Sequence, residues 1–171
     1  MIDHFLLFIV ALISNIFSAF SGGGAGVIQL PAILLLYEMS FITALASHKV
    51  ATVALGVGAT LKYFRKIQFD SKFIVVCLIL GLPGVVAGAN IISMVNDSIA
   101  RIMLGTLIII IALYSFSSKN FGEKTTQVKQ SFARVIITVV LITLIAMLNG
   151  SLSAGTGLMF TVFLIIFYGM D

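Results

Sequence analysis

Long apolar blocks separated by short polar interruptions run through almost the whole chain. A helix needs about 20 apolar residues to cross the roughly 30 Å hydrocarbon core of a bilayer, and most of these blocks approach that length. Seven apolar segments are expected as helices, at residues 5–20, 27–37, 41–61, 73–95, 102–115, 135–148 and 158–168. The pattern therefore predicts an all-α membrane protein, a polytopic helical bundle.

Two of the segments, 27–37 and 158–168, are too short to cross a bilayer as simple helices. At the rise of an α-helix each reaches only about 16 Å. Each follows a longer segment across a break of small residues, at 21–26 in the first case and 149–157 in the second. We therefore expect two helical hairpins, each broken by glycines.

The two broken hairpins are similar in sequence as well as in outline. Composition alone supplies some identities between apolar segments, so the recurrence of the same unusual feature carries more weight. An offset of 131 residues places Gly24 on Gly155, Gly26 on Gly157, Tyr37 on Tyr168 and Met39 on Met170. We interpret the hairpins as the starts of two internal repeats.

The second repeat is incomplete. Residues 1–118 hold the first transmembrane repeat, a broken hairpin plus three helices, whereas residues 133–171 hold only a broken hairpin. Residues 119–132 form a basic loop between them. If the repeats match in full, roughly 75 to 80 residues are missing, which predicts a truncated form of a permease of about 250 residues.

Composition excludes a water-soluble globule. Hydrophobic residues make up 60% of the chain and charged residues 9%, whereas a soluble domain needs about a quarter of its residues charged. The net charge of +4 does not indicate nucleic acid as a partner, because the basic residues gather in two short stretches rather than over a binding face.

The two basic stretches, 62–72 and 119–134, set the orientation instead. The positive-inside rule predicts that both are cytoplasmic, in a multi-pass membrane protein with its N-terminus outside. The two hairpins then enter from opposite faces, which is an inverted-topology repeat. A cleaved signal peptide at residues 1–25 is the alternative; the lack of a basic residue before the first apolar block argues against it.

Both glycine-rich breaks are candidate binding sites for an anion. Unwound backbone inside a membrane needs protein, water or a ligand to satisfy its polar groups, and a helix that starts there directs its positive N-terminal end at the gap. Small residues that merely let helices pack closely are the alternative interpretation. The residues expected to shape the substrate site are Gly22, Gly23, Gly24, Gly26 and Pro31 at the first break and Asn149, Gly155, Thr156 and Gly157 at the second.

His48 and Lys49 are the candidate ionisable residues of this site. They lie about 10 to 12 Å into the helix expected from Phe41, a depth at which charge is costly and functional roles are common. Lys49 would attract an anionic substrate, and His48 could exchange a proton near neutral pH. The alternatives are that Lys49 extends to the outer interface or pairs with Glu38, and that His48 only bonds a neighbouring helix.

Other small residues favour packing over binding. Gly84 and Gly88 form a Gly-x-x-x-Gly pair, and Gly56 with Gly58 a second small surface, so both are expected at helix crossings. The chain carries none of the common hydrolase, nucleotide-binding or metal-ligating patterns. We therefore expect no enzyme, no metal and no cofactor.

Several of these segments together resemble a known family. They are Ser-Gly-Gly-Gly-Ala-Gly-Val-Ile-Gln-Leu-Pro at 21–31, Ala-Ser-His-Lys-Val-Ala at 46–51, the basic segment 63–70, the glycine-rich helix 81–89 and the second break 149–157. In combination they resemble the TauE/SafE family of sulfite exporters, also called DUF81 or TSUP permeases. The second break departs from the first at Thr156, and Val162 stands where the first half has Pro31.

The resemblance implies a permease that moves sulfite, sulfonates or another small organic anion by alternating access. It implies a lipid bilayer and a small anionic solute as partners, a coupling proton or ion, and either a homo-oligomer or a complementing subunit. The rival hypothesis is a non-transporting fragment, or one part of a split transporter that needs a partner subunit.

Overall fold

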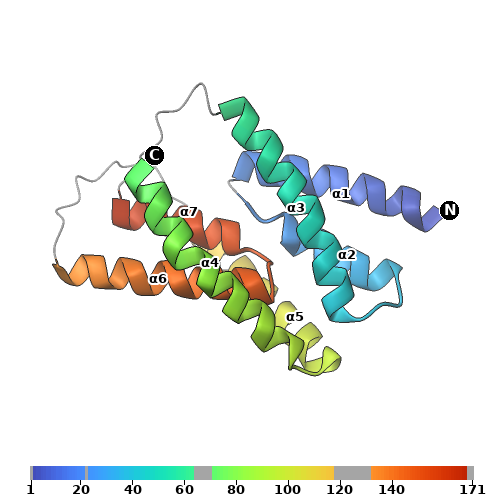
Figure 1. Ribbon diagram of the computed structural model, residues 1–171. Coiled ribbons are helices and arrows are strands. Elements are labelled where there is room, and N and C mark those ends of the chain that lie inside the picture. Colours follow the sequence, from blue (N-terminus) through green and yellow to red (C-terminus); the bar gives the residue numbers. More distant parts are fainter. Residues whose placement is uncertain (1, 22, 64–70, 118–131, 169–171) are drawn as a thin grey trace.

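The computed structural model describes residues 2–21, 23–63, 71–117 and 132–168, and within them it contains helices and short connections but no strand. The helices are α1 (Ile2–Ser21), α2 (Ala25–Leu36), α3 (Phe41–Tyr63), α4 (Ser71–Ser93), α5 (Asp97–Ser117), α6 (Phe132–Ser151) and α7 (Thr156–Tyr168) (Figure 1). Each coincides with one of the segments expected from the apolar pattern. The predicted all-α fold is confirmed.

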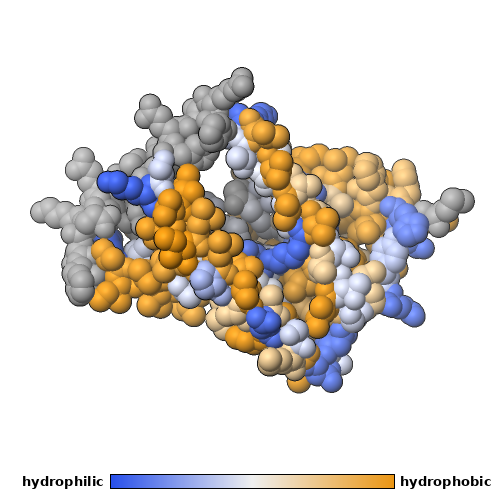
Figure 2. Space-filling model, viewed as in Figure 1, coloured by the Kyte–Doolittle hydropathy of each residue, from blue (hydrophilic) through white to orange (hydrophobic). Residues whose placement is uncertain are grey.

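Five of these helices, α1, α3, α4, α5 and α6, are long and apolar enough to cross a membrane. The helices α2 and α7 are apolar but shorter, which confirms that they are not simple spans. Large apolar side chains cover the outer faces of the long helices (Figure 2). Such surfaces are stable against lipid rather than water, so the chain is a multi-pass membrane protein.

The broken hairpins approach each other from opposite sides. Helix α1 packs against α2, and α6 packs against α7. In Figure 1, α1 runs from the N-terminus toward the middle of the molecule, and α6 runs toward the middle from the other side. Each hairpin therefore presents its break to the centre, as expected for two repeats of opposite topology.

The unwound segments are shorter than the expected 21–26 and 149–157. Helix α6 continues through Asn149 and Gly150 to Ser151, and α7 already begins at Thr156. The last turn of α6 continues because Leu152 N still donates to the Leu148 carbonyl at 2.9 Å. Four residues, 152–155, therefore make the second break.

The first break is also short, because α2 begins at Ala25 and takes Gly26 into its first turn. Positive φ angles change the chain direction in both breaks: 145° at Gly23 and 106° at Gly24 in the first, and 60° at Ser153 and 68° at Gly155 in the second. Only glycine adopts such angles without strain from a Cβ, which explains three of the four positions.

Helices α4 and α6 form the most extensive helix pair in the described part of the chain. The two backbones meet closely, since a Cβ added at Gly84 would lie 2.9 Å from the Thr143 carbonyl, and one at Gly88 would overlap the Met147 carbonyl. Gly150 of α6 abuts the Val85 carbonyl in the same way. The predicted packing role of the Gly-x-x-x-Gly pair is confirmed.

The described residues form no helix crossing at Gly56 and Gly58, contrary to the prediction. An added Cβ at either would meet none of the described residues within 4 Å. The C-terminal half of α3, where both lie, is exposed, because the described helices that pack on α3 contact its N-terminal half.

A polar clamp fixes the N-terminal end of α3. Asp97, at the start of α5, accepts a hydrogen bond from the Phe41 amide. Its Oδ2 atom also forms an ion pair with Nε of Arg101 at 2.7 Å. Arg101 also donates to the Met39 carbonyl at 2.7 Å. Phe41 itself is fully buried. The clamp thus holds the helix that carries His48 and Lys49 against α5.

Candidate functional site

The two breaks touch each other at the centre of the molecule. A Cβ added at Gly23 would lie 2.6 Å from the Cα of Gly157, and one at Gly24 would lie 3.4 Å from Cδ1 of Leu158. Backbone therefore meets backbone at Gly23, and the Leu158 side chain packs on Gly24. We call this contact of residues 23–26 with residues 153–158 the junction.

Gly26 lies where three parts of the fold meet. A Cβ there would be 2.9 Å from His48 Nε2, 2.9 Å from the Ser153 carbonyl oxygen and 3.2 Å from the Cα of Ala154. The helix α3 thus reaches the junction through His48, and the second break reaches it through a main-chain oxygen. Any side chain larger than hydrogen at Gly26 has to displace one of them.

His48 is 1% exposed, and its two ring nitrogens have different surroundings. Nδ1 lies 3.0 Å from Oε1 of Gln29 on α2, so the helix-to-helix hydrogen bond considered above is present. Nε2 is buried and, within the described part of the chain, has no hydrogen-bond partner. One nitrogen is therefore structural and the other is available.

Gln29 was missed by sequence reasoning. It is 4% exposed and orients the His48 ring. The signal was present in the sequence, because Gln29 is the one polar residue in the apolar half-helix Val-Ile-Gln-Leu-Pro. An amide at membrane depth requires a hydrogen-bond partner, and an ionisable residue on a neighbouring helix is a natural choice.

Lys49 is directed at the second hairpin. Its Nζ donates to the main-chain carbonyl of Asn149 and, at 3.0 Å, to the Asn149 Oδ1 atom. The suggested extension to the outer interface and the pairing with Glu38, which is exposed, are both wrong. An ammonium has three donors, so one remains beyond these two bonds.

Asn149 gathers donors from three directions. Besides Lys49, the Thr156 hydroxyl lies 3.1 Å from Asn149 Oδ1 and 3.2 Å from the Ser153 carbonyl, and the Ser153 hydroxyl lies 3.5 Å from Oδ1. The amide oxygen thus occupies a place where a cation and hydroxyl groups converge. A small oxyanion would suit the same donors.

Two helix N-termini add to this positive environment. The first-turn amides of an α-helix have no acceptor within the helix, and its N-terminal end carries about half a positive charge. Helix α7 starts at Thr156 and α2 at Ala25, both at the junction. The second break is buried from Ser151 to Thr156, so water does not screen its amides.

Cavities border both breaks of the junction. One of ≈ 330 Å³ opens between α4, α6 and α7 and is lined by Asn149, Thr156, Gly157 and the chain's one cysteine, Cys77. Another, of ≈ 260 Å³, is lined by Gly23, Gly24, Leu158 and residues of α1, α2 and α5. Residues of the junction therefore line two cavities.

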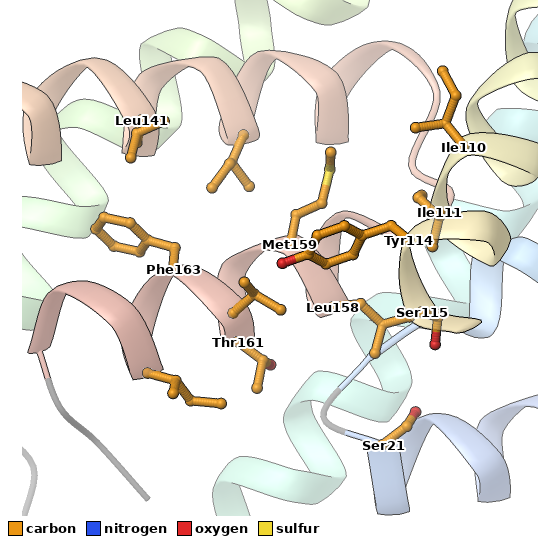
Figure 3. Close-up of a pocket in the computed structure, with 13 residues that line it drawn as sticks. Ser21, Ile110, Ile111, Tyr114, Ser115, Leu141, Leu158, Met159, Thr161 and Phe163 are labelled. Atoms are coloured by element: carbon orange, nitrogen blue, oxygen red, sulfur yellow. The ribbon is translucent and has the colours of Figure 1, made fainter. Parts of the chain in front are cut away.

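A third cavity, of ≈ 580 Å³, is mostly apolar and lies between α5, α6 and α7. Figure 3 shows Tyr114 of α5 extending across it toward Met159 of α7, and Ser21 and Ser115 at its edge near Leu158. Leu158, Ser21 and Ser115 also line the ≈ 260 Å³ cavity, so the two hollows are neighbours.

The remaining predicted site residues are Gly155, which belongs to the second break of the junction, Pro31 within α2, and Gly22. Gly155 is turned toward α5, where an added Cβ would overlap the Ile111 side chain. Pro31 lies inside α2, where it removes the amide that would bond the Val27 carbonyl. Gly22 lies outside the described residues, as does most of each basic stretch.

A family model described as "Sulfite exporter TauE/SafE" matches residues 7–171, which include the junction, His48 and Lys49. The chain belongs to the TauE/SafE family. The resemblance found in the sequence motifs is thereby confirmed, and the elements that form the junction belong to the family's domain.

Curated relatives of this TauE/SafE chain include two at 28% identity over about nine tenths of it: "Probable membrane transporter protein ORF9" of Sinorhizobium sp and "Probable membrane transporter protein" of Haemophilus influenzae. "Probable membrane transporter protein YfcA" of Escherichia coli K12 is 28% identical over 71% of it. The chain spans 58% of the length of the first two relatives and 45% of the third. No solved structure matches the chain.

Proposed function

We propose that this TauE/SafE chain binds a small oxyanion of the sulfite or sulfonate class at the junction and forms the substrate-holding part of a secondary transporter. The observation that carries the proposal is the Lys49 ammonium bonded to Asn149 between two broken hairpins. Family membership and relatives named as probable membrane transporters support transport over catalysis.

The anion would replace Asn149 as the acceptor for donors already in place. Lys49 supplies the charge, Thr156 supplies a hydroxyl group, and the first-turn amides of α7 supply main-chain donors. A lysine at the centre of a membrane helix costs about 2.5–3.5 kcal/mol by insertion scales. The bound anion would offset this cost, because its negative charge stabilises the lysine ammonium.

Movement would follow from opening the junction on one side at a time. Cavities flank it, and glycine contacts such as Gly23 on Gly157 leave no interlocked side chains to be separated. In inverted-repeat transporters, the two hairpins can exchange conformations, so that a state open to one side of the membrane converts into a state open to the other side. A proton or ion gradient would supply the driving force in a bacterial inner membrane, with the N-terminus outside and the basic stretches inside.

The second candidate function is that of one part of a split transporter, or of a fragment that does not transport. The observation that favours it is the glycine face of α3 at Gly56 and Gly58, which no described residue covers. In that case the chain binds the anion at the junction but moves it only when a complementing subunit is present.

Lys49→Gln is the test of the binding site. In proteoliposomes we expect it to reduce binding and counterflow of labelled sulfite at least tenfold, because the site loses the ammonium group that contacts Asn149 of the second hairpin. Lys62→Gln, on the exposed last turn of the same helix, is the matched control and should leave both unchanged. Equal binding by Lys49→Gln and the unchanged chain would refute the proposed site. Binding without counterflow in the unchanged chain would favour the split transporter.

A further inference from the structure

We propose that Nε2 of His48 binds one proton together with the anion, so that the junction takes up a proton and an anion as a linked pair. This inference rests on the proposed anion site and names the ion coupled to it. It concerns a ring nitrogen that the anion contacts described above do not use.

The geometry fixes the chemistry of each ring nitrogen. Gln29 offers its amide oxygen to Nδ1 at 3.0 Å, so Nδ1 carries the hydrogen of the neutral ring. Nε2 then presents a lone pair, and it is buried with no donor among the described residues. An unsatisfied buried acceptor is energetically costly, and binding of a proton to Nε2 would remove that cost.

An acceptor for the protonated form is already close. The Ser153 carbonyl oxygen and His48 Nε2 lie against the same side of Gly26, each 2.9 Å from the position of an added Cβ. Because Gly26 has no side chain, no Cβ atom lies between the Ser153 carbonyl oxygen and His48 Nε2. An N–H on Nε2 could therefore be directed at the second break, or at an anion held there.

The charges around His48 link its proton to the anion. Lys49 is its neighbour on α3, whereas the groups facing it from α2 and the second break, Gln29 and Ser153, are uncharged. The ion pair of Asp97 with Arg101 belongs to the clamp at the N-terminal end of α3. Two adjacent cations, one buried and one half-buried, repel each other, so protonation of His48 is favoured when an anion shares the site.

Linkage makes this coupling reciprocal. If the anion favours the protonated ring, then protonation must favour the anion by the same factor. For one linked proton, affinity for the anion rises as pH falls, by up to about tenfold per pH unit while the free site is neutral and the occupied site is protonated.

The test uses methanesulfonate as the probe, because its own charge is constant near neutrality. Its dissociation constant would be measured on the purified chain in lipid nanodiscs from about pH 7 to about pH 5, together with proton uptake by a pH dye. We expect tighter binding at lower pH and about one proton taken up per anion bound. His48→Gln should bind with little dependence on pH and take up no proton.

His4→Gln is the matched control, because His4 lies at the start of α1 against Tyr37 and should leave the pH dependence unchanged. Gln29→Leu should bind the anion but with an altered pH dependence, since the ring loses its orientation. Anion binding by the unchanged chain with no proton uptake would overturn the coupling while the anion site stands. A persistent pH dependence in His48→Gln would overturn it too. No anion binding at any pH would refute the proposed function itself.

Discussion

Lys49 shows how a single charge is held at membrane depth. Its ammonium is half-buried and bonded to two oxygens of Asn149, one hundred residues away in sequence. Hydrogen bonds to charged groups contribute about 1.5–3 kcal/mol, so Asn149 stabilises both the lysine and the contact between the two hairpins. The same residue therefore affects folding and the proposed binding site.

Asn149→Ala tests this double role. The variant leaves Lys49 with one main-chain acceptor, so we expect a loss of about 1.5–3 kcal/mol in stability and clearly weaker methanesulfonate binding. Asn90→Ala, on an exposed face of α4, is the control and should change neither by more than about 0.5 kcal/mol. Thermal unfolding in detergent and a binding isotherm give the two values. Equal stability of both variants would contradict the role assigned to Asn149.

At the scale of single residues, depth singled out His48 and Lys49, and the second glycine-rich break singled out Asn149 and Thr156; the structure brings Lys49, Asn149 and Thr156 into contact, and their binding role stays a prediction. Gln29 escaped notice because an uncharged amide stands out less than a charge in apolar sequence. Gly155 was expected to shape the substrate site, yet it faces α5. The direction in which a broken segment turns depends on tertiary packing, which no local pattern encodes.

Helix pairs depend on where small residues find a partner. At the crossing of α4 and α6, Gly84, Gly88 and Gly150 each meet backbone, whereas Gly56 and Gly105 meet nothing within 4 Å. Sequence cannot separate these cases, because all are glycines in apolar helices. The elements themselves were predictable from apolar length, but the two breaks came out too long because glycine was assumed to end a helix.

Gly88→Leu tests the crossing. The side chain would overlap the Met147 carbonyl, so α4 and α6 must separate, at a cost of at least about 1–3 kcal/mol. Gly105→Leu, in open space on α5, should be neutral or slightly stabilising, since leucine favours a helix more than glycine does. Thermal unfolding of the two purified variants provides the comparison. Equal destabilisation by Gly105→Leu would contradict the claim that close backbone packing at the crossing of α4 and α6 requires glycine.

At the scale of the whole molecule, the two hairpins, entering from opposite sides, place their glycine breaks in contact at the centre. This arrangement followed from the sequence repeat, and α3 and α5 complete the first half around it. The orientation of the two basic stretches stays a prediction. The chain spans 58% of the length of its first relatives.

The contact between the two breaks can be measured by cross-linking in native membranes. Ser21 of the first hairpin and Leu158 of the second line the same two cavities, and Cys77 can be replaced by serine to give a cysteine-free background. Ser21→Cys with Leu158→Cys should be joined by a short bifunctional maleimide. Leu6→Cys with Leu158→Cys is the control, because Leu6 lies roughly 22 Å farther along α1.

Mass spectrometry of the digested protein gives the answer directly. The account predicts a joined peptide pair within one chain for Ser21 with Leu158, in high yield, and little or none for Leu6 with Leu158. Failure of the Ser21 pair to join, or equal joining of both pairs, would show that the two glycine breaks do not meet inside the membrane.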